Sequence, residues 1–292
     1  MIISKTPYRI SFFGGGSDYP NWYLKNGGEV ISTTINKYIY LSCRNLPPFF
    51  NHKHRIVWSR VELVKNSNQI KHKAVKNMMK YFKIKNGLEI HYDGDLPAKS
   101  GMGSSSCFVV GLINTIHALK KIKLNKKNLA KKSIYFEQKI LKETVGSQDQ
   151  IAASYGGFNK IKFNPGGGFN IYPIKMSIRN INYLNKNLVL LYTGIKRTAQ
   201  HVAKSYVNKL NKDKKNEIKQ ILSFVREAEN ILENNRYNDF GRLLHESWLT
   251  KKKLSSKVSN LSIENIYEDA IKKGALGGKL LGAGGGGFFL LY

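Results

Sequence analysis

Glycine and serine residues are concentrated in the stretch SGMGSSS, residues 100–106, directly before an apolar segment with helical spacing. The first N–H groups of a helix have no partner within it, and the helix dipole places positive charge at that end. Glycines let the backbone approach an anion bound there. The stretch therefore predicts either a cradle for phosphate groups or a helix capped by Ser104 or Ser105 behind a flexible loop. Its spacing matches neither GxxxxGK[ST] nor GxGxxG, so those two nucleotide-binding folds are not indicated.

Two further glycine clusters lie near the two ends of the chain. The stretch TPYRISFFGGGSDYP places Arg9 and Asp18 on either side of Gly14–Gly16, and the stretch KLLGAGGGGFFLLY closes the chain. An arginine can stabilise the charge of a transferring phosphate. Each cluster alone is weak evidence, but the three together favour the phosphate cradle over the capped helix.

The three clusters, in this order, resemble the motifs of the GHMP kinase superfamily. The first motif matches residues 7–18 and the third matches residues 281–288. The second, Pro-x-x-x-Gly-Leu-Gly-Ser-Ser, matches residues 97–105, with Met102 where leucine is usual. Within the superfamily, PYRISFFGGGSDYP, VGSQDQIAASYGG and LYTGIKRTAQ resemble the bacterial D-glycero-D-manno-heptose 7-phosphate kinases. Galactokinases usually carry Gly-Glu-His-Thr-Asp where this chain has Gly-Gly-Gly-Ser-Asp, which disfavours galactose.

The resemblance implies ATP-dependent phosphorylation of the anomeric hydroxyl of a heptose 7-phosphate. The product would be the 1,7-bisphosphate, which feeds nucleotide-activated heptoses for surface polysaccharides. Two alternatives stay open: another sugar kinase of the superfamily, of the fucose or galactose type, and a noncatalytic basic protein with the same fold. The presence of Asp149, Glu137 and Ser105 argues against the noncatalytic alternative.

The resemblance also implies roles for individual residues. Asp149 and Arg9 would be catalytic, because the aspartate would accept or orient the proton of the sugar hydroxyl and the arginine would stabilise the transferring phosphate. Ser105 and Glu137 would hold Mg²⁺. The expected ATP-phosphate residues are Lys99, Gly101, Met102, Gly103, Ser104, Ser105 and Ser106.

The sugar phosphate is expected to lie between the first glycine cluster and the catalytic aspartate. Its 7-phosphate needs cationic partners, and Lys196 and Arg197 are the candidates. The expected substrate-binding residues are Arg9, Gly14, Gly15, Gly16, Ser17, Asp18, Asp149, Lys196 and Arg197. The third cluster is expected to shape the wall of the active site through Gly282, Gly284, Gly285 and Gly286.

Hydrophobic periodicity predicts the elements that must position these residues. The strands expected in the first half are residues 2–13, 29–45, 55–63 and 87–97, followed by a hairpin over 156–174. The helices expected there are residues 68–84, 104–120 and 125–141, with a short helix from about 147. The second half is expected to hold a buried strand at 188–194, a helix at 216–234 and two short apolar strands around the last glycine cluster.

This mixture predicts an α+β fold with two domains, residues 1–180 and 181–292. The resemblance implies a ribosomal-protein-like α/β domain that binds ATP, followed by a ferredoxin-like α+β domain. Relatives usually continue with a further helix and strand after the third motif, whereas this sequence stops at Tyr292. The C-terminal domain is therefore expected to be shortened, with GGFFLLY as an exposed apolar edge.

Composition limits the class of protein and its partners. The chain has 292 residues, 41% of them hydrophobic, and a formal net charge of +29 that comes mostly from lysines spread along its length. A spread of this kind indicates a solvated basic surface, so nucleic acid is not an expected partner. The two cysteines, the lack of a signal peptide and the absence of a long apolar run predict a cytoplasmic protein with no membrane partner. ATP and a small sugar phosphate are the expected partners, and a homodimer is possible.

Overall fold

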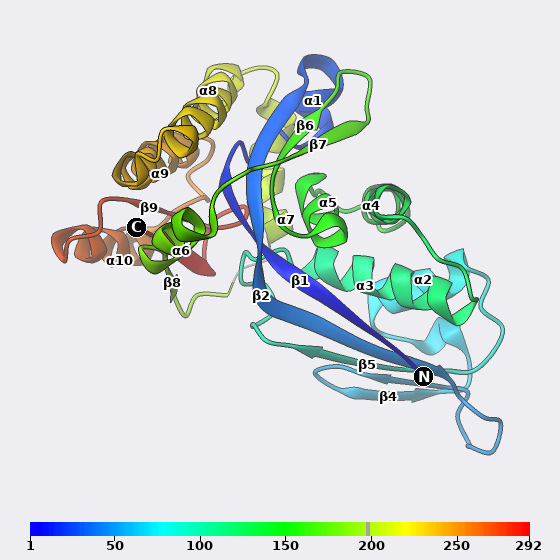
Figure 1. Cartoon of the computed structure of the whole chain (residues 1–292). Helices are drawn as coiled ribbons and strands as arrows, with labels where there is room; N and C mark the ends of the chain where they lie inside the picture. The colour runs from blue at the N-terminus through cyan, green and yellow to red at the C-terminus, as the bar shows by residue number, and fades with distance from the viewer. Residues whose placement is uncertain (197–198) are drawn as a thin grey trace.

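The computed structural model describes residues 1–196 and 199–292 (Figure 1). Its first half is built on a seven-stranded sheet whose longest member, β2 (Gly28–Asn45), pairs with three other strands. Strand β1 (Ile2–Phe13) is antiparallel to β2, with Ile2 opposite Cys43 and Phe13 opposite Ile31. The two halves of β2 pair separately with β5 (Leu88–Gly94) and β6 (Phe158–Phe163). The outer strands are β3 (His54–Val57), β4 (Val61–Val64) and β7 (Phe169–Pro173).

Helix α3 (Ser104–Leu119) is the central helix of this half and contacts both β1 and β2. Buried residues occupy almost its whole circumference after Ser105, as expected for a helix enclosed by other elements. Helices α4 (Lys126–Tyr135) and α5 (Gln148–Tyr155) pack beside it (Figure 1). Other helical segments of this half include α1 (Pro20–Asn26), the short turn η1 (Ser67–Gln69) and α2 (Lys73–Tyr81).

The second half contains a three-stranded sheet in the order β8 (Val189–Tyr192), β10 (Phe288–Leu291), β9 (Gly278–Leu280). Around it lie α6 (Ile178–Lys186), α7 (Ala199–Lys204), η3 (Val207–Lys209), α8 (Lys215–Glu233), α9 (Tyr237–Lys252) and α10 (Leu261–Lys272). Helices α8 and α9 form an antiparallel pair beside the first half (Figure 1).

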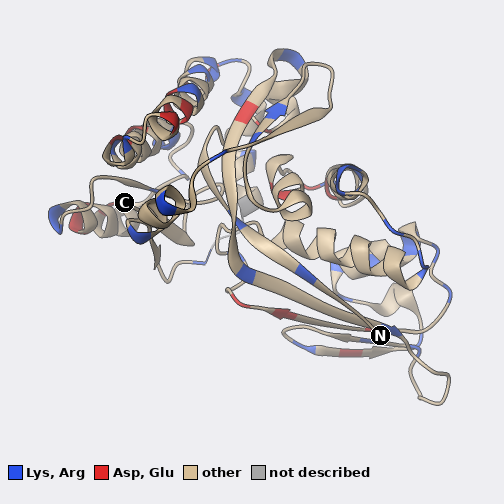
Figure 2. Cartoon of the chain, viewed as in Figure 1, with Lys and Arg blue, Asp and Glu red and all other residues tan. Residues whose placement is uncertain are grey.

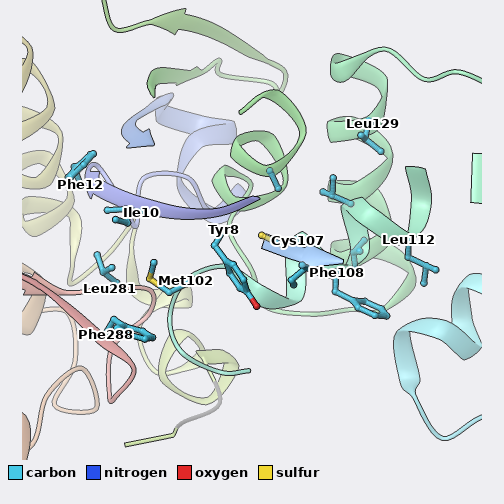
Figure 3. Packing of buried hydrophobic residues seen from close by; sticks show 14 of the residues in the cluster. Tyr8, Ile10, Phe12, Met102, Cys107, Phe108, Leu112, Leu129, Leu281 and Phe288 are labelled. Atoms are coloured by element: carbon cyan, nitrogen blue, oxygen red, sulfur yellow. The ribbon is translucent and has the colours of Figure 1, made fainter. Parts of the chain in front are cut away.

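The hydrophobic core continues from one half into the other. Phe12 and Phe13 of β1 both make edge-on contacts with Phe240 of α9, at ring centroid distances of 5.2 Å. Figure 3 shows Leu281 and Phe288 close to Met102 and β1, and all of them belong to one buried cluster. The two halves are thus held together by shared apolar packing, which fixes the walls of the space between them.

The mixed α+β architecture is confirmed, and most predicted elements are present. The division into domains at residue 180 stays a prediction, and this residue lies inside α6. The predicted single strand at 55–63 is wrong: it is the hairpin β3–β4, in which Val57 pairs with Val61. The predicted helix at 125–141 is interrupted, because α4 passes into a π-helical turn, η2 (Phe136–Ile140).

Two predictions for the C-terminal sheet are also wrong. The segment 288–292 is not an exposed edge, because β10 lies between β8 and β9 and all five residues are buried. The strand predicted as buried, β8, is the exposed edge, with Val189 56% and Leu191 38% exposed. Apolar composition alone could not separate the two strands, since their position in the sheet decides which one is covered.

No helix among the described residues is long and apolar enough to cross a membrane. Figure 2 shows Lys and Arg on elements of both halves of the molecule. This distribution agrees with the prediction of a basic surface that is spread over the fold.

Candidate active site

A cavity of about 510 Å³ lies between the two halves and is lined by parts of all three glycine clusters. The second cluster contributes Gly101, Gly103 and Ser104–Ser106 to the lining, and the third contributes Gly282, Gly284 and Gly286. Arg9, Gly15, Gly16, Asp18 and Asp149 also line it. The fold therefore brings together most of the residues that the motifs predicted, from positions far apart in the sequence.

The N-terminus of α3 opens into this cavity without a side-chain cap. Its N-cap residue is Gly103, which has a left-handed backbone (φ 78°, ψ 20°) and no side chain to accept the first N–H groups. The alternative of a helix capped by Ser104 or Ser105 is therefore wrong. The first turn keeps unpaired N–H donors and a positive dipole end facing the cavity, which is the arrangement that favours an anion.

Arg9 and Asp149 form a two-pronged ion pair beside this helix end. The Nε and Nη2 atoms of Arg9 donate to Oδ1 and Oδ2 of Asp149, each at 2.7 Å, and Nη1 donates to the carbonyl of Gly101 at 2.7 Å. Burial by itself lowers the pKa of Arg9, but the Asp149 carboxylate raises it overall, so the guanidinium stays charged. A Cβ atom at Gly103 would lie 3.3 Å from Oδ2 of Asp149, which places the ion pair directly against the helix N-terminus.

Asp18 joins the first glycine cluster to the start of α5. Its Oδ1 accepts a hydrogen bond from the Gly16 N–H at 2.9 Å, and its Oδ2 accepts one from the Gln148 N–H at 3.3 Å. Burial raises the pKa of Asp18, while the bonds from these backbone donors oppose the rise. A Cβ atom at Gly146 would overlap the Asp18 carboxylate, so this contact requires glycine there. Asp18 therefore helps to orient the turn that carries Asp149, besides facing the cavity.

The π-helical turn η2 places Glu137 behind the serines at the N-terminus of α3. Glu137 is fully buried, accepts a hydrogen bond from Ser105 Oγ at 3.3 Å and another from Gln150 Nε2 at 2.5 Å. Burial raises the pKa of Glu137 to about 8. A π turn holds one more residue than an α turn, so it changes which side chains face α3, and such turns are often found at functional sites.

The donors at Ser105 and Glu137 fit a magnesium ion only in part. Mg²⁺ is commonly held by one or two carboxylates together with phosphate oxygens and waters, so one carboxylate and one hydroxyl beside a phosphate cradle suit it. No group of three or more His, Cys, Asp or Glu side chains among the described residues could hold a metal by itself. The remaining ligands would therefore have to come from the nucleotide and from water.

The third glycine cluster packs directly on the second. A Cβ atom at Gly101 would lie 2.6 Å from the carbonyl oxygen of Leu281, and one at Gly282 would lie 2.7 Å from Cα of Gly101. The backbone of Phe288 also donates to the carbonyl of Ser100 at 3.1 Å. These close approaches agree with the expected role of the cluster as a wall of the site.

Several predicted residues have other surroundings. The side chain of Met102 is fully buried in the core (Figure 3). Ser17 is buried and donates to the carbonyls of Gly14 and Glu29, so Ser17 and Gly14 shape the turn and do not border the cavity. Lys196 is exposed and is not part of the cavity lining, and Arg197 lies outside the described residues. Gly285 is not part of the cavity lining either, and its N–H donates to the carbonyl of Val258 at 2.8 Å.

Other cavity residues were missed by the sequence analysis. Trp58, His72, Tyr92 and Phe108 form an aromatic part of the lining, in which His72 stacks on Phe108 at a centroid distance of 4.8 Å. Lys251 and Lys279 are buried and also line the cavity. The lysines carry no distinguishing signal in a chain with 48 Lys and Arg residues.

Two orphaned polar atoms also lie at the cavity. Ser11 Oγ and Gln148 Oε1 are buried without a hydrogen-bond partner among the described residues, and both side chains line the cavity beside Gly15. Buried polar atoms normally have partners. These two are therefore candidates to bind hydroxyl groups of a ligand.

Comparisons with known proteins agree with this geometry. The model of the GHMP kinases N terminal domain matches residues 59–157, and that of the GHMP kinases C terminal domain matches residues 214–291. The D-glycero-alpha-D-manno-heptose 7-phosphate kinase of Campylobacter jejuni is 30% identical and covers 100% of this chain and 89% of its own length. The bifunctional fucokinase/GDP-fucose pyrophosphorylase of Arabidopsis thaliana is 26% identical over 98% of this chain and 29% of its own length.

Solved structures show the same fold. A putative sugar kinase from Campylobacter jejuni has a TM-score of 0.70 and 27% identity, and it covers 99% of this chain and 87% of its own. A D-glycero-D-manno-heptose 1-phosphate kinase from Bacteroides thetaiotaomicron has a TM-score of 0.77 and 23% identity, and it covers 100% of this chain and 88% of its own. With both family domains present in order and a relative matched over nearly its full length, the chain belongs to the GHMP kinases and is an ATP-dependent kinase.

Proposed function

We propose that this kinase transfers the γ-phosphoryl group of ATP to the anomeric hydroxyl of D-glycero-D-manno-heptose 7-phosphate. The product is the 1,7-bisphosphate, a precursor of nucleotide-activated heptoses for surface polysaccharides. The observation that carries the proposal is the ion pair of Arg9 and Asp149 against the open N-terminus of α3, in a cavity that Ser11, Asp18 and Gln148 also line. The identity to the Campylobacter jejuni heptose 7-phosphate kinase supports the choice of substrate.

In this proposal the ATP phosphates lie at the N-terminus of α3, where Lys99, the glycines 101 and 103 and the serines 104–106 surround them. The aromatic lining at Trp58, His72 and Phe108 is suited to a nucleotide base, because its flat apolar faces can stack on it. A magnesium ion held by Ser105 and Glu137 would neutralise phosphate charge. Positioning and charge neutralisation are the main requirements of phosphoryl transfer.

The sugar lies on the opposite side of Asp149. Asp18, Ser11 and Gln148 supply acceptors and a donor for its hydroxyl groups, and the glycine turn at 14–16 lets the ring approach the backbone. The anomeric hydroxyl donates to the carboxylate of Asp149, which orients it toward the γ-phosphorus and can take its proton. Arg9 holds that carboxylate in place and stabilises charge on the transferring group.

A coupled ADP-release assay over a panel of acceptors tests the proposal. The panel contains the heptose 7-phosphate, mannose, fucose and galactose, each measured with and without Mg²⁺. We expect turnover with the heptose 7-phosphate in the presence of Mg²⁺ and much less with the three neutral sugars. Turnover of fucose or galactose at a higher kcat/KM than the heptose phosphate would refute the assignment. ³¹P NMR of the product then identifies the position of the new phosphate.

A further inference from the structure

Two buried lysines from the second half of the chain line the cavity. Lys251, on α9, is 8% exposed, and Lys279, on β9, is 5% exposed. Neither makes an ion pair with a carboxylate among the described residues. Lysine is rarely buried unless it is paired, because an uncompensated ammonium group in the interior is costly. Their position therefore needs an explanation in terms of a partner.

Backbone carbonyls satisfy only part of these two ammonium groups. Lys251 Nζ donates to the carbonyls of Leu280 and Gly282, each at 2.6 Å, and Lys279 Nζ donates to the carbonyl of Phe12 at 2.7 Å. A lysine ammonium has three N–H donors. Each lysine thus keeps at least one donor without an acceptor among the described residues, at the surface of the cavity.

The other cations of the cavity are already engaged or lie elsewhere. Arg9, Lys99, Lys251 and Lys279 are the Lys and Arg residues that line it within the described part of the chain. Arg9 is neutralised by Asp149, and Lys99 is exposed on the loop before α3. The two buried lysines are therefore the cavity cations left for a second anion, besides the phosphates of ATP.

The carbonyl partners place the two lysines at different parts of the cavity wall. Lys251 lies beside Gly282, which packs on Gly101, and Lys279 lies beside Phe12. The Phe12 carbonyl that holds Lys279 lies on β1 between Arg9 and the glycine turn at 14–16, which is the sugar side of the cavity. Burial, and then the charge of Arg9, lowers the pKa of Lys279 to about 7. Burial, and then the charges of Lys279 and Arg9, lowers the pKa of Lys251 well below its usual value. An anion at this place would compensate the positive charges that now repel one another.

We propose that Lys251 and Lys279 form the binding site for the phosphate group that the acceptor sugar already carries. This inference rests on the proposed function, and it replaces the exposed Lys196 as the partner of that phosphate. Two ammonium groups that share one phosphate monoester give charge-assisted hydrogen bonds, the strongest polar contacts available to a dianion. The enclosed position would let the enzyme reject sugars without a phosphate, because the lysines would then stay buried and unpaired.

The first test uses inorganic phosphate as the probe, so that it does not depend on which sugar is the substrate. The enzyme is saturated with Mg²⁺ and a non-hydrolysable ATP analogue, and phosphate is titrated in by calorimetry. We expect binding to wild type, and binding weaker by about tenfold or more in Lys279→Met, since a charge-assisted bond is lost. The matched control is Lys253→Met, which removes the same charge from an exposed position close to Lys251. Equal phosphate affinity in folded Lys279→Met and wild type would overturn the proposal.

The second test separates the acceptor phosphate from the phosphoryl group of ATP. Kinetics are measured with the heptose 7-phosphate and with the same heptose lacking the phosphate. We expect Lys279→Met to raise the KM of the phosphorylated acceptor by about tenfold or more. The KM for ATP and the KM of the unphosphorylated acceptor should change little. An equal loss with both acceptors would mean that the lysines act on the transferring group, which contradicts the proposal.

Loss of folding is controlled separately. Far-UV circular dichroism and the melting temperature are recorded for each variant, and Lys251→Met provides a second reading if Lys279→Met does not fold. Lysine-dependent binding of phosphate without turnover of the heptose 7-phosphate would reject the proposed substrate and retain the anion site. Turnover of the heptose 7-phosphate with KM unchanged in both lysine variants would retain the proposed substrate and reject the anion site.

Discussion

Arg9 and Asp149 are 140 residues apart in the sequence and form an ion pair through two hydrogen bonds of 2.7 Å. The same arginine donates to the carbonyl of Gly101, so one guanidinium connects Asp149 to the glycine-rich loop before α3. An arginine with this fork geometry fixes the plane of the carboxylate as well as its distance. The orientation of the Asp149 carboxylate is thus set by a residue of β1.

Asp149→Asn should abolish most phosphoryl transfer while leaving ATP binding in place. The amide keeps the size of the side chain but cannot take a proton, and its NH₂ group cannot accept a bond from Arg9. We expect kcat to fall by about 10²–10⁴-fold, the usual contribution of a general base. An ADP-release assay measures the loss of kcat, and a nucleotide titration measures whether ATP still binds. Asp93→Asn, at an exposed position on β5, is the control for charge, and a near-normal kcat in Asp149→Asn would remove Asp149 from the mechanism.

Gly103→Ala should damage nucleotide use beyond its effect on stability. Gly103 has a φ of 78°, and a Cβ atom there would press on Asp149 and on Arg9 at 3.3–3.5 Å. Gly166→Ala is the matched control, because its φ is 77° and its Cβ would meet nothing within 4 Å. Both variants should lose about 1–2 kcal/mol of unfolding free energy from the left-handed backbone. Only Gly103→Ala should also lower kcat/KM for ATP, and equal kinetics in the two variants would contradict the close packing.

Glu137→Gln should reduce kcat to a very low value. The remaining activity should no longer depend on the concentration of Mg²⁺. Glutamine keeps the shape and can still accept a bond from Ser105, but it removes the single carboxylate of the predicted magnesium site. The experiment is a Mg²⁺ titration of kcat at saturating ATP, with Glu227→Gln at an exposed position as the control. A normal Mg²⁺ dependence in Glu137→Gln would show that the metal is held elsewhere.

The stability gained by Lys279→Met should depend on pH in a defined way. In the folded wild type the pKa of Lys279 is lowered to about 7 from 10.5, and the groups that face it are Arg9, Lys251 and the Phe12 carbonyl. A lowered lysine pKa destabilises the fold in full below about pH 7, and this cost disappears as the pH rises toward 10.5. The melting temperature of the variant relative to wild type should therefore be highest near pH 7 and decline toward pH 10. Thermal unfolding of both proteins from pH 6.5 to 10 measures how this difference in melting temperature changes with pH, and Lys253→Met should show no such trend.

Local sequence signals were sufficient to find most elements and many of the residues that line the cavity. The Gly-x-Gly-Ser-Ser-Ser pattern before an apolar run indicated the open end of α3, because the glycines and serines that form it are neighbours in the sequence. The strands β1 and β2 followed from their alternation. By contrast, the turn between β3 and β4 at residues 58–60 has no glycine or proline, so the hairpin looked like one strand. The π turn at Glu137 likewise has no sequence signature of its own.

Contacts between distant segments could not be obtained in this way. Nothing near Lys251 or Lys279 distinguishes them from the other lysines, and only the fold shows that both are buried at the cavity while Lys196 is exposed. The choice between β8 and β10 as the exposed strand has the same origin, since both are short apolar runs and only the order of the sheet decides which is central.

The sequence by itself determined the family, the glycine-rich start of α3 and the acidic and basic residues proposed for catalysis, because these depend on residues close together in the chain. The tertiary structure decided which of those groups meet. It paired Arg9 with Asp149, set Asp18 against Gly146, placed Met102 in the core and buried two lysines at the cavity. Such pairings arise from the packing of the two halves on a shared core, and packing joins residues without regard to their separation in sequence.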